Sequence, residues 1–217
     1  MKNLLIKELR LSASPLSYIF LTAALMTMLP GYPILMSAFF ICFGNFHTFQ
    51  NAREANDTLY SVLLPVSKND IVRARFVFII VIQSAGFLLC AALTALRMTV
   101  LSDTKPYTGN SLMNATPVYL AFVLLIYCAF NILFAAGFYK TAYKIGIPFI
   151  RFGSAVFILV AAAEILPHLP GLTFLHSPKG ERQGVQFAAL AAAAVVYCVF
   201  TAAACRISQK RFEKIDL

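Results

Sequence analysis

Hydrophobic residues gather in five uncharged stretches of the chain: residues 11–52, 76–96, 118–139, 152–163 and 184–205. A helix needs about 20 apolar residues to cross a bilayer. The first stretch is long enough for two such helices, and Pro30-Gly31-Tyr32-Pro33 breaks it near the middle with residues typical of a tight turn. The fourth stretch reaches span length once it takes in residues 145–151. The pattern therefore predicts an all-α polytopic membrane protein with six transmembrane helices.

The first of these spans is the shortest. As an α-helix, residues 16–29 would rise only about 21 Å, which is less than a hydrocarbon core of roughly 30 Å. Two interpretations stay open for this segment. Residues 30–33 either form a full reversal between two spans, or the segments on both sides of them form a kinked or re-entrant pair.

Composition and charge agree with a membrane protein and orient it. The sequence of 217 residues is 60% hydrophobic and 12% charged, which argues against a soluble enzyme. Membrane proteins retain Lys and Arg on the cytoplasmic side. With six spans, fourteen of the 18 basic residues fall on the side of the two termini: Lys2, Lys7, Arg10, Arg53, Lys68, Arg73, Arg75, Lys140, Lys144, Arg151, Arg206, Lys210, Arg211 and Lys214. We therefore expect both termini in the cytoplasm, and we assign the net charge of +9 to topology and anionic lipid rather than to nucleic acid.

The first residues predict a helix that lies along the membrane surface. Residues 1–11 separate into an apolar face and a largely charged face: Leu4, Leu5 and Leu9 against Lys2, Lys7, Glu8 and Arg10. This separation is typical of an amphipathic interfacial helix in the headgroup plane, and a frayed basic leader is the alternative.

The longest cytoplasmic connection, residues 53–75, contains signals for a helix of its own. Asn56 or Asp57 can cap a short helix that Pro65 ends. Ser67, followed three residues later by Asp70, matches a relative of the capping box and predicts the start of the next helix. Two interpretations of this short helix stay open. It either acts as a rigid lever between two long spans, or it is no more than a well-terminated connection.

These features together resemble the membrane permease subunit of type-two, export-class bacterial ABC transporters. The sequence NDTLYSVLLPVSKNDIVRAR at residues 56–75 resembles the cytoplasmic loop of that family in its acidic residue, its Leu-Pro-Val-Ser turn and its basic helix start. The resemblance implies a single permease domain over residues 1–217 in the bacterial cytoplasmic membrane. Within it, residues 1–11 would be an elbow helix, 53–75 a coupling loop and 206–217 a cytoplasmic tail.

The resemblance also implies partners and a function. In this family the helix after the second span couples to an ATP-binding subunit, which implies this role for residues 56–64 here. Six residues would make or orient that contact: Arg53, Glu54, Asp57, Leu59, Val62 and Leu63. A second permease copy or a sister permease would complete a homodimer or heterodimer. The assembly would export an amphipathic or hydrophobic cargo, such as a peptide or a drug, by alternating access.

No phosphate-binding loop of the form G-x-x-x-x-G-K-[ST] occurs in the chain. We therefore expect a non-catalytic subunit without a cofactor, whose partner chain binds and hydrolyses ATP with Mg²⁺. Two other functions stay open: a six-span substrate-capture subunit of an uptake transporter, and an intramembrane enzyme that uses Glu164 and His168.

Three polar side chains in predicted spans are candidates for a substrate path or gate: Glu164, Asn131 and Gln83. A charge such as Glu164 costs roughly 2.5–3.5 kcal/mol at the bilayer centre. Glu164 follows residue 147 by about 25 Å of helix, however, which favours a place near the outer headgroups. Asn131 and Gln83 need hydrogen-bond partners, which either another helix or a cargo can supply.

Overall fold

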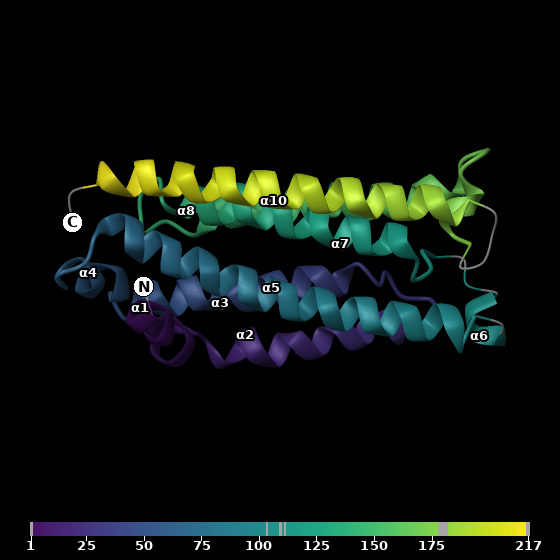
Figure 1. Ribbon diagram of the computed structural model, residues 1–217, viewed down its shortest axis with the longest axis horizontal. Helices are drawn as coiled ribbons and strands as arrows, with labels where there is room; N and C mark the ends of the chain where they lie inside the picture. The colour runs from purple at the N-terminus through teal and green to yellow at the C-terminus, as the bar shows by residue number, and fades with distance from the viewer. Residues whose placement is uncertain (1, 103, 109, 111, 178–181, 216–217) are drawn as a thin grey trace.

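The computed structural model is an elongated bundle of helices along one common axis (Figure 1). The structure describes residues 2–102, 104–108, 110, 112–177 and 182–215, which contain no β-strand. One end of the bundle carries α4, α1 and the last turns of α10, and we call it the α4 end (Figure 1). The opposite end carries α6, and we call it the α6 end. The all-helical fold predicted from the sequence is thus confirmed.

The described helical segments follow one another in this order: α1 (Lys2–Lys7), the π segment η1 (Glu8–Ser12), α2 (Pro15–Ile19), the 3-10 segment η2 (Phe20–Met28), α3 (Met36–Glu54), α4 (Asp57–Val62), α5 (Lys68–Thr99), α6 (Lys105–Thr108), α7 (Pro117–Ala129), the π segment η3 (Phe130–Ala135), α8 (Ala136–Phe138), α9 (Gly146–Ile165), the 3-10 segments η4 (Leu166–His168) and η5 (Thr173–Leu175), and α10 (Gln183–Glu213).

The first helical segments form a right angle. The pair α1–η1 meets the pair α2–η2 at 90°. Pro15 explains the position of the break, because a residue before proline is held in extended backbone, and Ser14 has φ −70° and ψ 137°. The Ser14 hydroxyl accepts a hydrogen bond from Leu16 N at 3.3 Å and so starts α2. One detail of the predicted amphipathic pattern is wrong: Glu8 is 1% exposed, because it turns inward to Arg75 of α5.

The first predicted span is longer than its residue count indicates. Only Pro15–Ile19 is α-helical, and Phe20–Met28 is a 3-10 helix. A 3-10 helix rises about 2.0 Å per residue against about 1.5 Å for an α-helix, so the two segments together extend about 25 Å instead of about 21 Å. The short hydrophobic stretch thereby approaches the roughly 30 Å of a hydrocarbon core.

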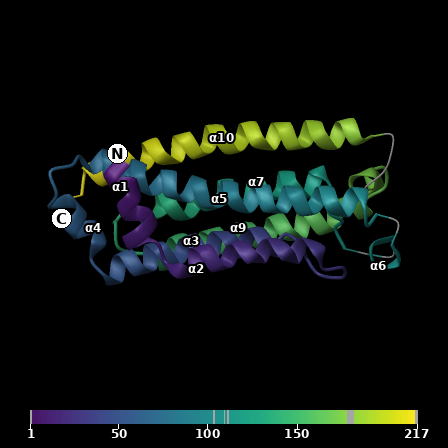
Figure 2. The same cartoon turned by 60° about the horizontal axis from the view of Figure 1, so that its bottom comes forward.

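Aromatic rings pack α3 against α8 and α9. The ring centroids of Phe46 and Phe149 lie 4.3 Å apart, and those of Phe49 and Phe138 lie 5.0 Å apart. Between helices in a bilayer, such van der Waals contact replaces water exclusion as the source of packing energy. Figure 2 shows α2, α3 and α9 together on one side of the bundle, with α10 on the other.

Among the described residues, four helical segments are long and apolar enough to cross a membrane: Lys68–Thr99, Pro117–Phe138, Gly146–His168 and Gln183–Glu213. The bent pair Asn3–Ser12 and Pro15–Met28 makes five if it counts as one span. The remaining long helix, α3, carries Asn45, His47 and Gln50, which lower its hydropathy. Neighbouring helices rather than lipid enclose Asn45, which is fully buried. The count of six spans stays a prediction.

Gly44 allows α2 and α3 to approach closely. A Cβ atom on Gly44 would lie 2.9 Å from Ser17 Cα, and the Ser17 hydroxyl donates a hydrogen bond to Gly44 O at 2.7 Å. We expect Gly44→Ala to force the helices apart and to reduce the free energy of unfolding by about 1–3 kcal/mol. The apparent melting temperature in detergent should fall. Gly153→Ala is the control, since its new methyl group would meet no atom within 4 Å; equal melting temperatures for both variants would contradict the close approach.

Candidate functional site

The connection between α3 and α5 contains the predicted short helix, α4. Asn56 reverses the chain before it with a left-handed backbone (φ 51°), which asparagine tolerates better than most residues. After it, the Ser67 hydroxyl accepts a hydrogen bond from Asp70 N at 3.1 Å and donates one to the Asp70 carboxylate at 2.8 Å. The predicted capping-box relative is confirmed, and α4 is held between two defined turns.

Beneath α4 lies a cluster of four charged side chains, Lys7, Glu8, Asp57 and Arg75, which we call the charge cluster. Arg75 Nε lies 2.6 Å from Glu8 Oε2, and Arg75 Nη2 lies 3.0 Å from Asp57 Oδ2. Lys7 Nζ lies 2.6 Å from Asp57 Oδ1 and 3.7 Å from Glu8 Oε1. Each carboxylate therefore contacts both cations, and the four charges balance.

The charge cluster is withdrawn from solvent. Glu8 and Arg75 are 1% and 4% exposed. Buried ions need further hydrogen bonds to offset the loss of water. Neighbouring groups supply them to Asp57, Lys7 and Arg75: the Ser12 hydroxyl donates to Asp57 Oδ2 at 3.2 Å, the Ser61 hydroxyl accepts from Lys7 Nζ at 2.5 Å, and the Thr48 carbonyl accepts from Arg75 Nη1 at 3.5 Å.

The charge cluster joins segments that are far apart in the sequence. Lys7 ends α1, Glu8 begins η1, Asp57 begins α4, and Arg75 lies two turns into α5. Separating a buried charge from its partners costs about 3–5 kcal/mol, so these segments resist separate movement. The charge cluster therefore holds α4 to the first helix and to α5.

The predicted coupling residues of α4 divide between its two sides. Leu59 and Leu63 are 43% and 75% exposed, and Tyr60 and Leu64 beside them are also exposed. We call these four side chains the α4 patch. Val62 instead packs against the hydrophobic core. Asp57 also points inward, into the charge cluster.

The other two predicted coupling residues, Arg53 and Glu54, belong to the last turn of α3. Glu54 Oε1 accepts a hydrogen bond from Gln50 Nε2 at 3.0 Å and lies 3.9 Å from Arg53 Nη2. The Arg53 guanidinium lies 5.7 Å from the centre of the Tyr143 ring. Both side chains thus occupy the edge of the α4 end, outside the α4 patch.

Glu8 and Arg75 have no predicted site role, yet they form the centre of the charge cluster. The sequence does contain a signal for Arg75. It lies four residues after Ile71 and four before Ile79, which places it on the buried face of α5. A charge on such a face requires a buried partner. The sequence does not identify that partner as Glu8, because their contact depends on the right-angled bend after η1.

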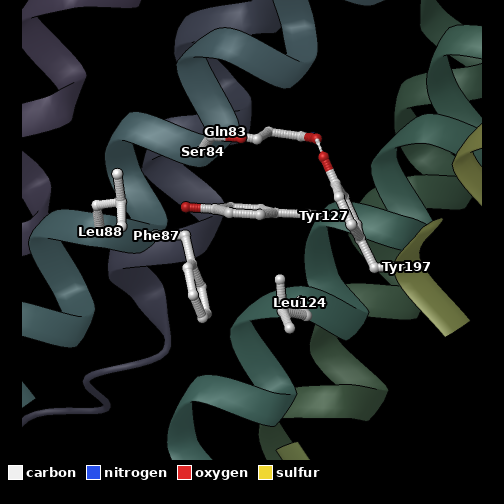
Figure 3. A pocket seen from close by; sticks show the side chains of 7 residues that line it. All are labelled: Gln83, Ser84, Phe87, Leu88, Leu124, Tyr127 and Tyr197. Atoms are coloured by element: carbon white, nitrogen blue, oxygen red, sulfur yellow. Dashed lines mark hydrogen bonds between the residues drawn. The ribbon is translucent and has the colours of Figure 1, made fainter. Parts of the chain in front are cut away.

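Gln83 and Asn131 come together midway along the bundle. Two hydrogen bonds of 3.1 Å join their amide groups, one in each direction. Asn131 Nδ2 also donates to Thr201 Oγ1 at 2.9 Å. The Tyr197 hydroxyl donates to Gln83 Oε1 at 2.9 Å, as Figure 3 shows. This network ties α5, η3 and α10 together, and Asn131 lies in a π segment, a form of helix frequent at functional sites. A role in a cargo path stays a prediction.

Glu164 lies apart from that network, at the end of α9. Its Oε2 accepts a hydrogen bond from Met113 N at 2.7 Å, so it fixes the segment that enters α7. In the described part of the chain, Glu164 has no hydrogen bond to Gln83 or Asn131. The same residues contain no group of three His, Cys, Asp or Glu side chains placed to bind a metal ion.

Removing one charge from the cluster should lower the free energy of unfolding by more than the loss of a single ion pair would. Arg75→Gln leaves two buried carboxylates with Lys7 alone and should destabilise the protein by about 3–5 kcal/mol. In Arg75→Gln with Glu8→Gln, Lys7 and Asp57 still balance. The double loss should therefore be smaller than the sum of the single losses by about 1–3 kcal/mol. Apparent melting temperatures of the four proteins measure this coupling, and additive losses would show that the charges act independently.

The family described as ABC-2 family transporter protein matches residues 3–213, which is nearly the whole chain. No curated protein and no solved structure matches. Members of the family are membrane components of ABC transporters and associate with an ATP-binding subunit. With its span-length helices and this match, the chain belongs to the ABC-2 transporter family as a multi-pass membrane permease.

Proposed function

We propose that this permease is the membrane subunit of an exporter that moves an amphipathic or hydrophobic cargo out of the bacterial cytoplasm. The export direction and the cargo follow from the family resemblance, and the observation that carries the contact with an ATP-binding subunit is the two-sided character of α4. Its outer side is the apolar α4 patch, and its inner side is anchored in the charge cluster. An exposed apolar surface on a fixed helix suits a protein partner. The ATP-binding subunit of the family is the partner that we assign to it.

The proposed mechanism is mechanical. The α4 patch seats α4 on the ATP-binding subunit, as the coupling-helix resemblance implies. When ATP closes two such subunits, α4 moves with them, and the charge cluster carries α5 and the first helix along as one rigid body. Leu59 and Leu63 would supply the contact, and Asp57 would transmit the movement. Arg53 and Glu54 would orient the partner at the edge of the α4 end.

The same proposal defines the other partners. ATP and Mg²⁺ belong to the ATP-binding subunit, so the α4 end and both termini face the cytoplasm. A second permease copy or a sister permease completes the membrane assembly. In the most apolar 18-residue stretch of α9, only 17% is buried inside the bundle, and the same holds for α10. Both helices therefore offer a face to such a copy or to lipid. Rearrangement of the two copies would change access to the cargo path.

The two alternative functions have less support. A capture subunit would be built around a pocket at the bilayer midplane. A cavity of about 250 Å³ does lie beside Gln83, but the family match and α4 favour an ATP-driven permease. An intramembrane enzyme would use Glu164, whose Oε2 accepts a hydrogen bond from Met113 N and whose Oε1 has no partner among the described residues, but the family match favours a permease.

Leu59→Asp tests the contact between α4 and the ATP-binding subunit. It places a charge in the α4 patch, and an unpaired charge in a closed interface should weaken binding at least about tenfold. We expect the ATP-binding subunit to co-purify with the unmodified permease and to be lost with the variant.

Leu169→Asp is the matched control, since Leu169 is 45% exposed and lies far from α4 in the chain. It should keep the ATP-binding subunit. If Leu59→Asp keeps the subunit equally well, or if Leu169→Asp loses it as completely, the α4 patch is not the docking surface.

A further inference from the structure

An apolar groove runs between α5 and α10 on the outside of the bundle. It has a volume of about 480 Å³, within the range of pockets that bind small molecules. Phe76, Val77 and Ile80 of α5 form one wall, and Cys198 and Ala202 of α10 form the other. These residues follow one another at helical spacing, so the groove runs parallel to both helices.

A separate cavity of about 250 Å³ lies farther along α5, and Tyr197 lines both spaces (Figure 3). The α5 wall of the groove itself, from Arg73 to Ile80, rises about 10 Å, which is within the roughly 15 Å of one hydrocarbon leaflet. The groove is therefore long enough to hold part of an acyl chain.

The end of the groove nearest the α4 end is positively charged. Arg73 lines it and is exposed, and the exposed Arg206 directly follows Cys205, a lining residue of α10. Within the described residues neither guanidinium group has an ion-pair partner. The Glu213 carboxylate, farther along α10, accepts a hydrogen bond from Asn69 at 2.6 Å instead. In the described part of the chain, Arg73 and the neighbouring Arg206 are thus available to an anion at this end of the groove.

We propose that the groove binds one anionic phospholipid, with an acyl chain along α5 and α10 and the phosphate between Arg73 and Arg206. Arginine recognises phosphate oxygens with paired, charge-assisted hydrogen bonds. The apolar walls match a hydrocarbon chain, which brings no polar group into the membrane interior. The site requires only that the chain lies in a membrane, so it stands or falls separately from the contact with the ATP-binding subunit.

Backbone chemistry argues against an extended peptide in the same place. Such a peptide would carry unpaired backbone N–H and C=O groups into hydrocarbon, where each costs several kcal/mol. An acyl chain brings no such groups. The exposed Arg73 at one end of the groove favours an anionic headgroup over the apolar face of another helix.

Native mass spectrometry of the full chain tests the proposal. The protein is released from membranes that contain equal amounts of phosphatidylglycerol and phosphatidylcholine, and the retained lipids are counted. We expect one phosphatidylglycerol per chain, retained at least about tenfold over phosphatidylcholine. Arg73→Gln with Arg206→Gln should abolish this preference. Arg151→Gln, an exposed cation beside a different hollow formed by α8 and α9, should leave it unchanged.

A second pair of variants tests the acyl-chain wall without a change of charge. Ala202→Trp fills the groove and should reduce retained phosphatidylglycerol at least about tenfold. Ala192→Trp, at an exposed alanine of α10 outside the groove, should not. Equal retention of the two lipids, or full retention by Ala202→Trp, would overturn the proposal. A disulfide between the Cys198 residues of two chains in the membrane would also overturn it, because a second copy would then cover the groove.

Discussion

A single buried guanidinium group governs the arrangement of the α4 end. The helical period of α5 places Arg75 on its protein-facing side, where the cation must find carboxylates. They come from Glu8, 67 residues earlier, and from Asp57, 18 residues earlier. Glu8 reaches Arg75 only because the extended Ser14 and Pro15 turn the first helix across the end of the bundle. The positions of α1, η1 and α4 thus follow from the need to neutralise one charge.

At the opposite end of the bundle, neutral hydrogen-bond acceptors instead of carboxylates stabilise a second buried guanidinium group. Arg97 is 3% exposed and donates hydrogen bonds to Thr27 O at 2.7 Å and to Asn114 Oδ1 at 3.0 Å, with the Tyr107 ring 4.3 Å from its guanidinium carbon. Between the two ends, ring packing and the amide pair of Gln83 and Asn131 hold the helices together. Water exclusion contributes little inside a bilayer, so directional contacts of this kind take over its role.

Much of this fold follows from local rules that the sequence displays. The apolar stretches, the proline turn, the start of α5 at Ser67 and the short helix α4 depend on residues close together in the chain, and the structure contains each of them. The 3-10 form of η2 and the burial of Glu8 depend on packing between distant segments, which no local pattern encodes. The apolar contact residues Leu59 and Leu63 of α4 could be predicted from the local pattern. The contacts of Asp57 inside the charge cluster could not, because they depend on distant segments. The polar residues of α3, such as the fully buried Asn45, find room because other helices enclose them, which no local pattern shows.

The 3-10 segment η2 also determines the length of the first helix. Its nine residues would shorten by about 4.5 Å if they rewound as an α-helix, since each residue would rise about 0.5 Å less. One end of η2 leads to the proline turn at residues 30–33, and the other leads through α2 to the right-angled bend. Because the charge cluster fixes α1 and η1 to α5, a change of winding inside the segment would move the proline turn relative to that cluster. The hydrogen-bond register of η2 thus sets the distance between the proline turn and the amphipathic helix.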